Sequence, residues 1–230
     1  MILDGADIID IGGFSSKPGA KTISLKEEEK RVIPIIKLIN KTFNKIIISV
    51  DTFRSEIAEK SLNEGASIIN DISGGDLDKN IYQISYKYKA PYIMMHMNGV
   101  PSNMQNNPKY ENINHDIIKD FTSKIDSAEK KGVCDIIIDP GFGFGKTIQH
   151  NYQILNNLKL YTVLKKPILV GISRKSMIYK LLKTDPSKAL NGTTSLNTIA
   201  LINGANILRV HDVKEAKEVI KLYSFLKENV

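Results

Sequence analysis

Polar and ionisable side chains stand at the ends of short apolar runs throughout this chain. Seven runs share this pattern: Asp7–Ile11 with Asp10, Ile46–Val50 before Asp51, Ala66–Ile69 before Asn70, Tyr92–Met95 before His96, Ile136–Ile138 before Asp139, Ile168–Ile172 before Ser173, Arg174 and Lys175, and Ile207–Val210 with Arg209 before His211. Carboxylates and amides suit the donors and acceptors of a polar ring, and cations suit an anion. Brought together, these groups could bind a ligand that carries both a polar ring and an anionic group.

The spacing of the runs predicts the elements that would bring them together. The polar residues recur at a mean of about 33 residues, the length of one βα unit, and unbroken Val/Ile/Leu runs are typical of parallel strands buried on both faces. Helical periodicity between the runs predicts helices over Leu25–Lys41, Ser55–Glu64, Asp78–Tyr88, Asn112–Lys131, Gln149–Leu158, Ser176–Leu182, Gly192–Asn203 and Val213–Lys227. Ser24 and Glu27 form a capping-box pattern before the first. Alternating strands and helices indicate an α/β protein.

We predict a (β/α)₈ barrel of the TIM type, in which functional groups lie at the C-terminal ends of the strands. Seven of its eight strands are visible, and Met1–Gly5 resembles the end of a helix. We therefore expect one domain, residues 1–230, that lacks an upstream βα unit. A barrel short of one strand exposes two sheet edges, so we expect this chain alone to be weakly active or inactive.

Composition narrows the class of protein. A chain of 230 residues buries roughly 70–75% of its unfolded surface, and no run approaches the about 18 apolar residues of a membrane span. The single cysteine, Cys134, excludes an internal disulfide. The net charge is +7, but the lysines are scattered along predicted helices, as on a solvated outer face. We expect a cytoplasmic enzyme of small molecules, with neither nucleic acid nor membrane as partner.

The segment Asp139–Lys146, DPGFGFGK, is the most unusual in the chain. Its glycines alternate strictly, which fits neither a Walker loop nor the GxGxxG dinucleotide pattern. Glycines let the backbone approach a flat ligand, and Phe142 and Phe144 offer ring faces. An aspartate beside such a surface suits a heterocycle with adjacent N–H donors. The alternative is a simple tight turn after a strand.

Two further groups have structural alternatives. Asp51 and Asn70 at strand ends suit a ligand with donors and acceptors, but Asp51, Thr52 or Asp71 could instead cap the following helices. The glycine-rich segment 12–19, GGFSSKPG, could be a lid over the rim or only a solvated loop.

The cations lie where TIM barrels commonly bind phosphate, after the last two strands. Lys175 and Arg209 form a natural anion clamp, and His211 could donate to a phosphate oxygen or be a structural histidine. We take Lys175, Arg209 and His211 as the candidate catalytic residues.

Together these motifs resemble the dihydropteroate synthase family of folate biosynthesis, essentially from end to end. The matching motifs are GGFSSKPGA, ISVDT, IIND, MMHMNG, DPGFGFGK, GISRKS and RVHD. The resemblance implies an enzyme that joins 6-hydroxymethyl-7,8-dihydropterin diphosphate to 4-aminobenzoate, releases diphosphate and is blocked by sulfonamides. It also implies a homodimer and a Mg²⁺ ion that accompanies the diphosphate. The family's ligand for that ion lies in a loop without counterpart here, so we expect no metal ligand in this chain.

The resemblance assigns roles to particular residues. It implies that the pterin site consists of Asp51, Asn70, Ile72, Met95, Asp139, Phe144, Gly171 and Lys175, that Arg209 and His211 bind diphosphate, and that Ser16, Pro18 and Ser176 contact aminobenzoate. The first loop departs from the common family form GGESTRPGA, since Phe14, Ser16 and Lys17 replace glutamate, threonine and arginine. Lysine lacks the bidentate fork of arginine, so we expect looser anion contact there.

Two rival interpretations remain. A related pterin-binding barrel transfers a methyl group from methyltetrahydrofolate to a corrinoid protein, but it has no diphosphate to hold, and Lys175, Arg209 and His211 argue against it. The other rival is an inactive fragment that folds poorly.

Overall fold

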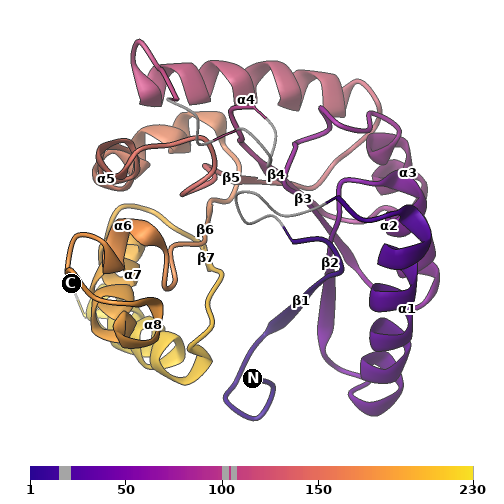
Figure 1. Ribbon diagram of the computed structural model, residues 1–230, viewed down its shortest axis with the longest axis horizontal. Coiled ribbons are helices and arrows are strands. Elements are labelled where there is room, and N and C mark those ends of the chain that lie inside the picture. The colour runs from indigo at the N-terminus through magenta and orange to yellow at the C-terminus, as the bar shows by residue number, and fades with distance from the viewer. Residues whose placement is uncertain (16–21, 100–103, 105–107, 230) are drawn as a thin grey trace.

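In the computed structural model, which describes residues 1–15, 22–99, 104 and 108–229, strands stand around a centre with helices outside them (Figure 1). The strands are β1 (Ile8–Gly12), β2 (Ile47–Asp51), β3 (Ile68–Asp71), β4 (Tyr92–Met95), β5 (Ile136–Asp139), β6 (Leu169–Val170) and β7 (Ile207–Leu208). The helices are α1 (Leu25–Thr42), α2 (Ser55–Asn63), α3 (Ile81–Tyr88), α4 (Ile113–Glu129), α5 (Ile148–Asn156), α6 (Ser176–Tyr179), α7 (Leu190–Ile202) and α8 (Val213–Glu228), with 3₁₀ turns η1 (Leu158–Leu164) and η2 (Pro186–Lys188). Alternation of strand and helix is as predicted.

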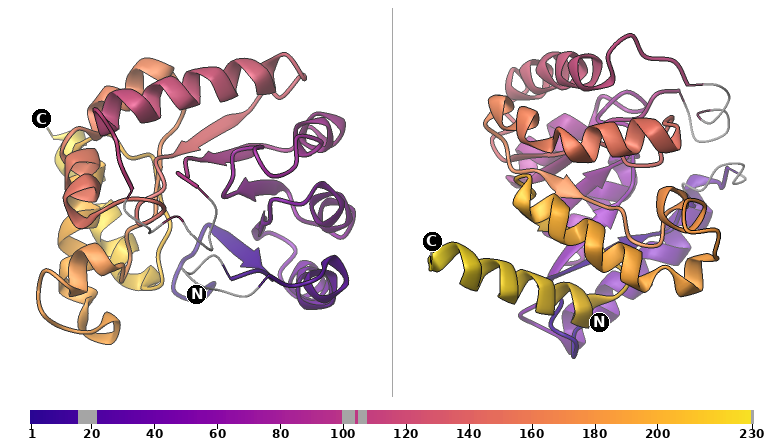
Figure 2. Two further views of the ribbon diagram at one scale, coloured as in Figure 1. Left: turned by 45° about the horizontal axis from the view of Figure 1, so that its top comes forward. Right: turned by 90° about the vertical axis from the view of Figure 1, so that its left-hand side faces the viewer.

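All strand pairs among the described residues are parallel. β1 to β5 pair in sequence order, β6 pairs with β7, and a bridge between Ile138 and Ile168 links the two groups. Within this register Asp51 lies opposite both Gly12 and Asn70. The C-terminal strand ends therefore meet at one rim, and Figure 2 shows the helices as an outer layer around them.

The predicted strands are displaced slightly from the observed ones. Asp51 and Asp139 are the last residues of β2 and β5 rather than the residues that follow them. β6 and β7 contain two residues each, because their ladder holds only the pairs Leu169–Ile207 and Val170–Leu208. The chain leaves the ladder just before Gly171 and Arg209, which frees both positions for the site.

Alternating strand residues build two apolar layers. Tyr92, Met94 and Ile138 point outward and pack with α4 residues such as Phe121 in the largest core cluster. Ile93 points inward, where Ile68, Leu169 and partly buried neighbours form a small interior cluster. The outward-facing side chains hold the strands against the helices. The few inward-facing side chains leave space for a cavity inside the ring of strands.

The observed helix termini agree only in part with the caps and ends predicted from the local sequence. Ser24 caps α1 by accepting from the Glu27 backbone at 3.2 Å. The full capping box predicted there is wrong, because the Glu27 carboxylate accepts from Arg31 at 2.8 Å instead. Asp78, which follows β3, accepts from the Ser55 backbone at 2.8 Å and so caps α2. The helix predicted over Ser176–Leu182 is only α6, and η1 extends α5 beyond its predicted end.

Charged side chains form ion pairs on the outer surfaces of α1, α2 and α3. Lysines there pair with glutamates of neighbouring helices, for example Lys60 with Glu29 at 2.7 Å and Lys87 with Glu59 at 2.6 Å. Such pairs are typical of a solvated face and contribute little to stability. Among the helices of the described residues, none combines the length and apolarity that crossing a bilayer would require.

Candidate active site

A cavity of about 470 Å³ lies inside the ring of strands. Five of the predicted site residues line it: Asn70, Gly171, Lys175, Arg209 and His211. Apolar interior residues such as Ile93 and Leu169 form its wall, and Asp10 of β1 also lines it. Polar recognition groups and apolar walls in one concavity are typical of a small-molecule site.

Arg209 joins the acidic residues of this rim. Its Nε donates to Asp10 at 2.7 Å and its Nη2 donates to Asp51 at 2.9 Å. Asp10 also accepts from the Asn70 side-chain amide at 3.0 Å. The helix-cap alternative for Asp51 is therefore wrong, since its carboxylate meets a guanidinium rather than a helix N-terminus.

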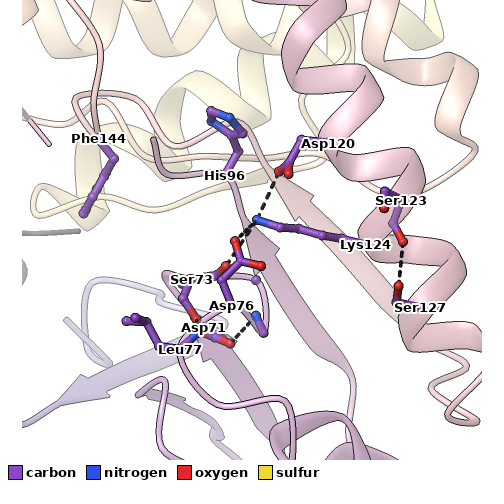
Figure 3. Close-up of polar contacts among 12 residues, drawn as sticks. Asp71, Ser73, Asp76, Leu77, His96, Asp120, Ser123, Lys124, Ser127 and Phe144 are labelled. Carbon is purple, nitrogen blue, oxygen red and sulfur yellow. Dashed lines mark hydrogen bonds and ion pairs between the residues drawn. The ribbon is translucent and has the colours of Figure 1, made fainter. Parts of the chain in front are cut away.

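Asp71, next to Asn70, stabilises the turn that follows β3 and does not cap a helix, since α3 begins only at Ile81. Its oxygens accept from the Ser73 backbone and hydroxyl and from the Gly75 backbone, each at 2.8 Å. Buried Lys124 of α4 ties the same turn down through Asp76 at 2.7 Å and the Ser73 carbonyl at 3.3 Å (Figure 3). This network holds Asn70 on a rigid strand end.

Hydrogen bonds within the DPGFGFGK loop and to the residue after β4 hold this loop against the rim. Asp139 accepts from the Gly141 backbone at 2.8 Å. Buried Lys146 donates to the carbonyls of Phe144 at 3.0 Å and His96 at 3.3 Å. The loop is thereby tied to the end of β4.

Lys175 reaches this loop from the turn after β6. Its ammonium donates to the Phe142 carbonyl and lies 5.0 Å from the centre of the Phe144 ring. Arg174, just before it, adopts a left-handed backbone with φ of 54° and pairs with Asp212 at 2.6 and 3.0 Å. Unusual backbone conformations are stored at functional sites when the surroundings hold them, and this one aims Lys175 at the pocket.

His211 is oriented by Ser173. The Ser173 hydroxyl oxygen accepts from the His211 backbone at 3.2 Å and lies 3.0 Å from the ring Nδ1. Since the hydroxyl then has its own proton to donate to Nδ1, we infer the tautomer that keeps a proton on Nε2. That nitrogen is the one suited to donate to an anion in the cavity.

Comparison with known proteins identifies the family. A family model described as "Pterin binding enzyme" matches residues 1–211. Dihydropteroate synthase from Escherichia coli is 42% identical over 224 residues, 96% of this chain and 79% of the relative. The chain belongs to the dihydropteroate synthase family. The enzyme from Synechocystis is 43% identical over 225 residues, 96% of this chain and 78% of the relative.

A solved dihydropteroate synthase confirms the predicted TIM-type barrel. The structure from Yersinia pestis, determined with a sulfonamide drug, matches with a TM-score of 0.95 at 38% identity and covers 99% of this chain and 82% of its own. The resemblance that the sequence motifs carried is therefore correct at the level of family and fold.

The remaining predicted residues of the dihydropteroate synthase site differ in how the structure places them. Ile72 and Met95 are buried beside the rim, and Phe144 is partly buried beneath Lys175. Ser176 begins α6 and is not among the residues that line the cavity. Ser16 and Pro18 lie outside the described residues.

Three residues that the structure places at the rim have no role in the site predicted from the sequence: Asp10, Lys146 and Ser173. Asp10 stands within a strand, and a buried carboxylate in an apolar run requires a partner, so a signal was present. Lys146 was considered only as part of a Walker pattern. Ser173 was noted as a strand end, but its contact with His211 spans 38 residues and leaves no local trace.

Burial shifts the pKa values of the dihydropteroate synthase site toward neutral pH. Removal from water, reinforced by neighbouring Asp10 and opposed by Arg209, raises the pKa of Asp51 to about 7. Burial likewise raises the pKa of Asp139, which Lys175 counteracts. The pKa of Lys175 is lowered to about 8, chiefly by burial. The pKa values of Asp51 and Lys175 thus lie near neutral pH, as is common for groups at functional sites.

These shifts predict a bell-shaped pH dependence of substrate affinity. Binding of a donor-rich ring needs ionised Asp51, so affinity should rise as pH increases through about 7. Lys175 donates most strongly to a ring acceptor as an ammonium, so affinity should fall as pH rises above about 8 and the ammonium loses its proton. Because the groups interact, the two limbs report the cluster as a whole. Titration calorimetry between pH 5.5 and 9.5 measures this, and a flat profile would contradict it.

Gly141 is one of the glycines of the DPGFGFGK loop at which a Cβ would clash with neighbouring backbone. Its φ is +70°, and a Cβ there would lie 2.0 Å from the His96 carbonyl oxygen. Gly143 has a similar φ of +81°, but a Cβ there would meet only Lys175 Cδ at 3.5 Å. Alanine substitutions at Gly141 and Gly143 therefore distinguish the stability lost through backbone strain, which both share, from that lost through a steric clash, which of the two only Gly141 has.

We therefore expect Gly141→Ala to lower the melting temperature about 1.5 to 4 times as much as Gly143→Ala. The first adds a clash worth about 1–3 kcal/mol to the left-handed penalty of about 1–2 kcal/mol that both share. Thermal unfolding monitored by circular dichroism measures both. Equal shifts would show that the loop does not pack on β4 as described.

Proposed function

We propose that this protein condenses 6-hydroxymethyl-7,8-dihydropterin diphosphate with 4-aminobenzoate, giving 7,8-dihydropteroate and diphosphate. The observation that carries this proposal is the meeting of two recognition sets at one rim. Carboxylates that suit ring donors, Asp51 and Asp139, lie within one charge cluster with the cations Lys175 and Arg209. A pterin diphosphate presents both kinds of group in one molecule.

The pterin ring is assigned to the acidic half of the rim. Asp51 and Asp139 accept from ring N–H donors, and Asn70 pairs with a donor and an acceptor together. Ile72, Met95 and Phe144 provide flat apolar walls, and Lys175 contacts a ring acceptor. At Gly171 a Cβ would lie 3.7 Å from that of Arg209, so the glycine keeps space for the ligand between the two strand ends.

Diphosphate is assigned to the cations of the other half. Arg209 binds two oxygens through its planar fork, and His211 donates from Nε2. The C–O bond to the exocyclic methylene breaks with its electrons on the diphosphate, and the electron-rich pterin delocalises the positive charge left behind. The aniline nitrogen then attacks that carbon and loses a proton. No protein nucleophile is needed, because leaving-group stabilisation and positioning carry the rate enhancement.

The aminobenzoate is assigned to the first loop and the start of α6, through Ser16, Pro18 and Ser176. The structure of the Yersinia pestis relative was determined with a sulfonamide drug, and we propose that sulfonamides compete with aminobenzoate here as well.

Magnesium is proposed as part of the substrate complex. No group of three potential metal ligands occurs among the residues that the structure describes, and Asp10 and Asp51 are already paired with Arg209. These residues do not form a metal cage of their own. Mg²⁺ keeps several waters and commonly enters with substrate phosphates, so we propose that it arrives bound to the diphosphate.

A chelation experiment tests this role of magnesium. We expect EDTA to weaken binding of inorganic diphosphate while binding of 6-hydroxymethylpterin, which carries no phosphate, stays unchanged. Calorimetry with and without EDTA measures both. Equal loss for both ligands would place the metal within the protein and contradict the proposal.

We also propose a homodimer, with α7 and α8 as its contact surface. These two helices pack together, and large apolar side chains on them are exposed: Ile199, Ile202, Leu222, Phe225 and Leu226. Exposed apolar patches mark interaction sites. Light scattering should give twice the chain mass, and Leu222→Glu with Phe225→Glu should give a monomer.

A two-substrate comparison separates the proposed reaction from its rival. We expect the protein to consume pterin diphosphate only when 4-aminobenzoate is present, and to release diphosphate in equal amount. A methyltransferase would instead demethylate methyltetrahydrofolate in the presence of a reduced corrinoid. Methyl transfer without condensation would overturn the proposal.

A further inference from the structure

Asp10 connects the two halves of the proposed site. One oxygen, Oδ2, accepts from Asn70 Nδ2 at 3.0 Å and from Arg209 Nε at 2.7 Å. The other oxygen, Oδ1, is buried and has no hydrogen-bond partner among residues 1–15, 22–99, 104 and 108–229. A single carboxylate therefore touches a residue assigned to the pterin and a residue assigned to the diphosphate.

The two carboxylate contacts of Arg209 are not equivalent. Nε points to Asp10, and Nη2 points to Asp51 at 2.9 Å. A guanidinium presents five N–H donors in a rigid plane, so a bond at Nε leaves the outer edge free to face an anion. Asp51 must turn its oxygens to the ring when pterin binds. The contact with Asp10 is thus the one compatible with a bound substrate.

We propose that Asp10 is a positioning residue, which holds Arg209 by Nε and Asn70 by its amide while Arg209 Nη2 exchanges Asp51 for the diphosphate of the substrate. The inference rests on the proposed function, since it assigns the exchanged partner. In this arrangement Asp10 is a permanent counter-ion and Asp51 a temporary one. When the diphosphate of the substrate binds Arg209, Asp51 is released from the guanidinium and can accept from the pterin ring of the same substrate.

Loss of the Asp10 charge is expected to weaken anion binding, which is the opposite of what simple charge repulsion predicts. Removing a negative charge from an anion site should strengthen anion binding if only the local potential matters. If Asp10 positions Arg209, its loss leaves Asp51 as the sole counter-ion, and the guanidinium can take it with both edge nitrogens. Diphosphate and pterin must then each break a stronger Arg209–Asp51 ion pair. The affinity of the protein for both ligands should therefore fall.

The experiment compares Asp10→Asn with Asp7→Asn in the whole protein. Asp7 stands three residues earlier, is exposed and pairs with Lys217 at 3.0 Å, so its replacement removes the same charge from the part of the cavity wall away from Arg209 and Asn70. We expect Asp10→Asn to weaken binding of inorganic diphosphate with Mg²⁺, and of 6-hydroxymethylpterin, by about tenfold or more at unchanged melting temperature. Asp7→Asn should change each by less than about twofold. Unchanged or tighter binding by Asp10→Asn would overturn the inference.

A double-mutant cycle tests whether Asp10 acts through Arg209. In an Arg209→Ala background we expect Asp10→Asn to have no further effect on diphosphate binding. A purely structural role would give the same loss in both backgrounds and would contradict the proposal. Failure of the parent protein to bind either ligand would instead overturn the proposed function itself.

A measurement on the unaltered protein covers the case in which Asp10→Asn does not fold. The Nε–H resonance of Arg209 can be followed in ¹⁵N spectra and assigned with Arg209→Lys. We expect this resonance to remain protected from exchange with water and nearly unmoved when diphosphate and pterin saturate the site. Its loss or a large shift on binding would show that the Asp10 contact breaks, and the inference would fall.

Discussion

Asp139→Asn is expected to weaken binding of 6-hydroxymethyl-7,8-dihydropterin diphosphate by about 10- to 150-fold while the protein stays folded. The carboxylate accepts from ring donors, and an amide would turn its own N–H toward them. Loss of a hydrogen bond to a charged group costs about 1.5–3 kcal/mol, which corresponds to this range. The amide oxygen can still accept from the Gly141 backbone, as Asp139 does at 2.8 Å, so the loop should persist.

Asp135→Asn is the matched control for this variant. Asp135 immediately precedes β5 and is exposed, whereas Asp139 ends the same strand and is buried. We expect its substitution to leave affinity unchanged. Calorimetry gives the affinities, and thermal unfolding shows that both variants fold. An Asp139→Asn protein with parental affinity would remove Asp139 from the pterin site.

Arg209→Ala is expected to weaken binding of inorganic diphosphate by about 10- to 150-fold and to leave 6-hydroxymethylpterin nearly unaffected at pH 8. The guanidinium addresses the leaving group and not the ring. The pH matters because Arg209 holds down the pKa of Asp51. Without it that pKa rises further, so at lower pH pterin binding would also suffer through protonation of Asp51.

Lys217→Ala provides the comparison for Arg209→Ala. Lys217 lines the same cavity but pairs with exposed Asp7, away from the rim. Its loss should change diphosphate binding by less than about twofold. Equal losses of diphosphate and pterin in Arg209→Ala would mean that Arg209 shapes the whole pocket, and the anion clamp would be the wrong description.

The strands and most helices could be predicted because local sequence carries their signals. Unbroken aliphatic runs bury both faces of a parallel strand, and each ends at a group that cannot stay in an apolar layer. Asp51 and Asp139 therefore lie at the rim for the same reason that they can bind a ligand. Ser24 and the start of α1 were likewise predictable from a local cap.

The contacts among site residues could not be predicted, because they join distant segments. Arg209 lies 199 residues from Asp10 and 158 from Asp51, and no local pattern shows which carboxylate takes which nitrogen. Asp78 caps α2, whose first residue, Ser55, lies 23 residues earlier in the chain. Glu27 fits a capping box by spacing, yet Arg31 one turn later competes for its carboxylate. Tertiary geometry decides each of these cases.

The most direct test of the central claim is formation of dihydropteroate from labelled 4-aminobenzoate. The purified protein, in the length in which the cell makes it, is incubated with pterin diphosphate and Mg²⁺. We predict that labelled dihydropteroate and diphosphate form in a 1:1 ratio, and that Arg209→Ala abolishes both together. Diphosphate release without labelled product, or no turnover by a protein that is folded and binds both substrates, would contradict the account.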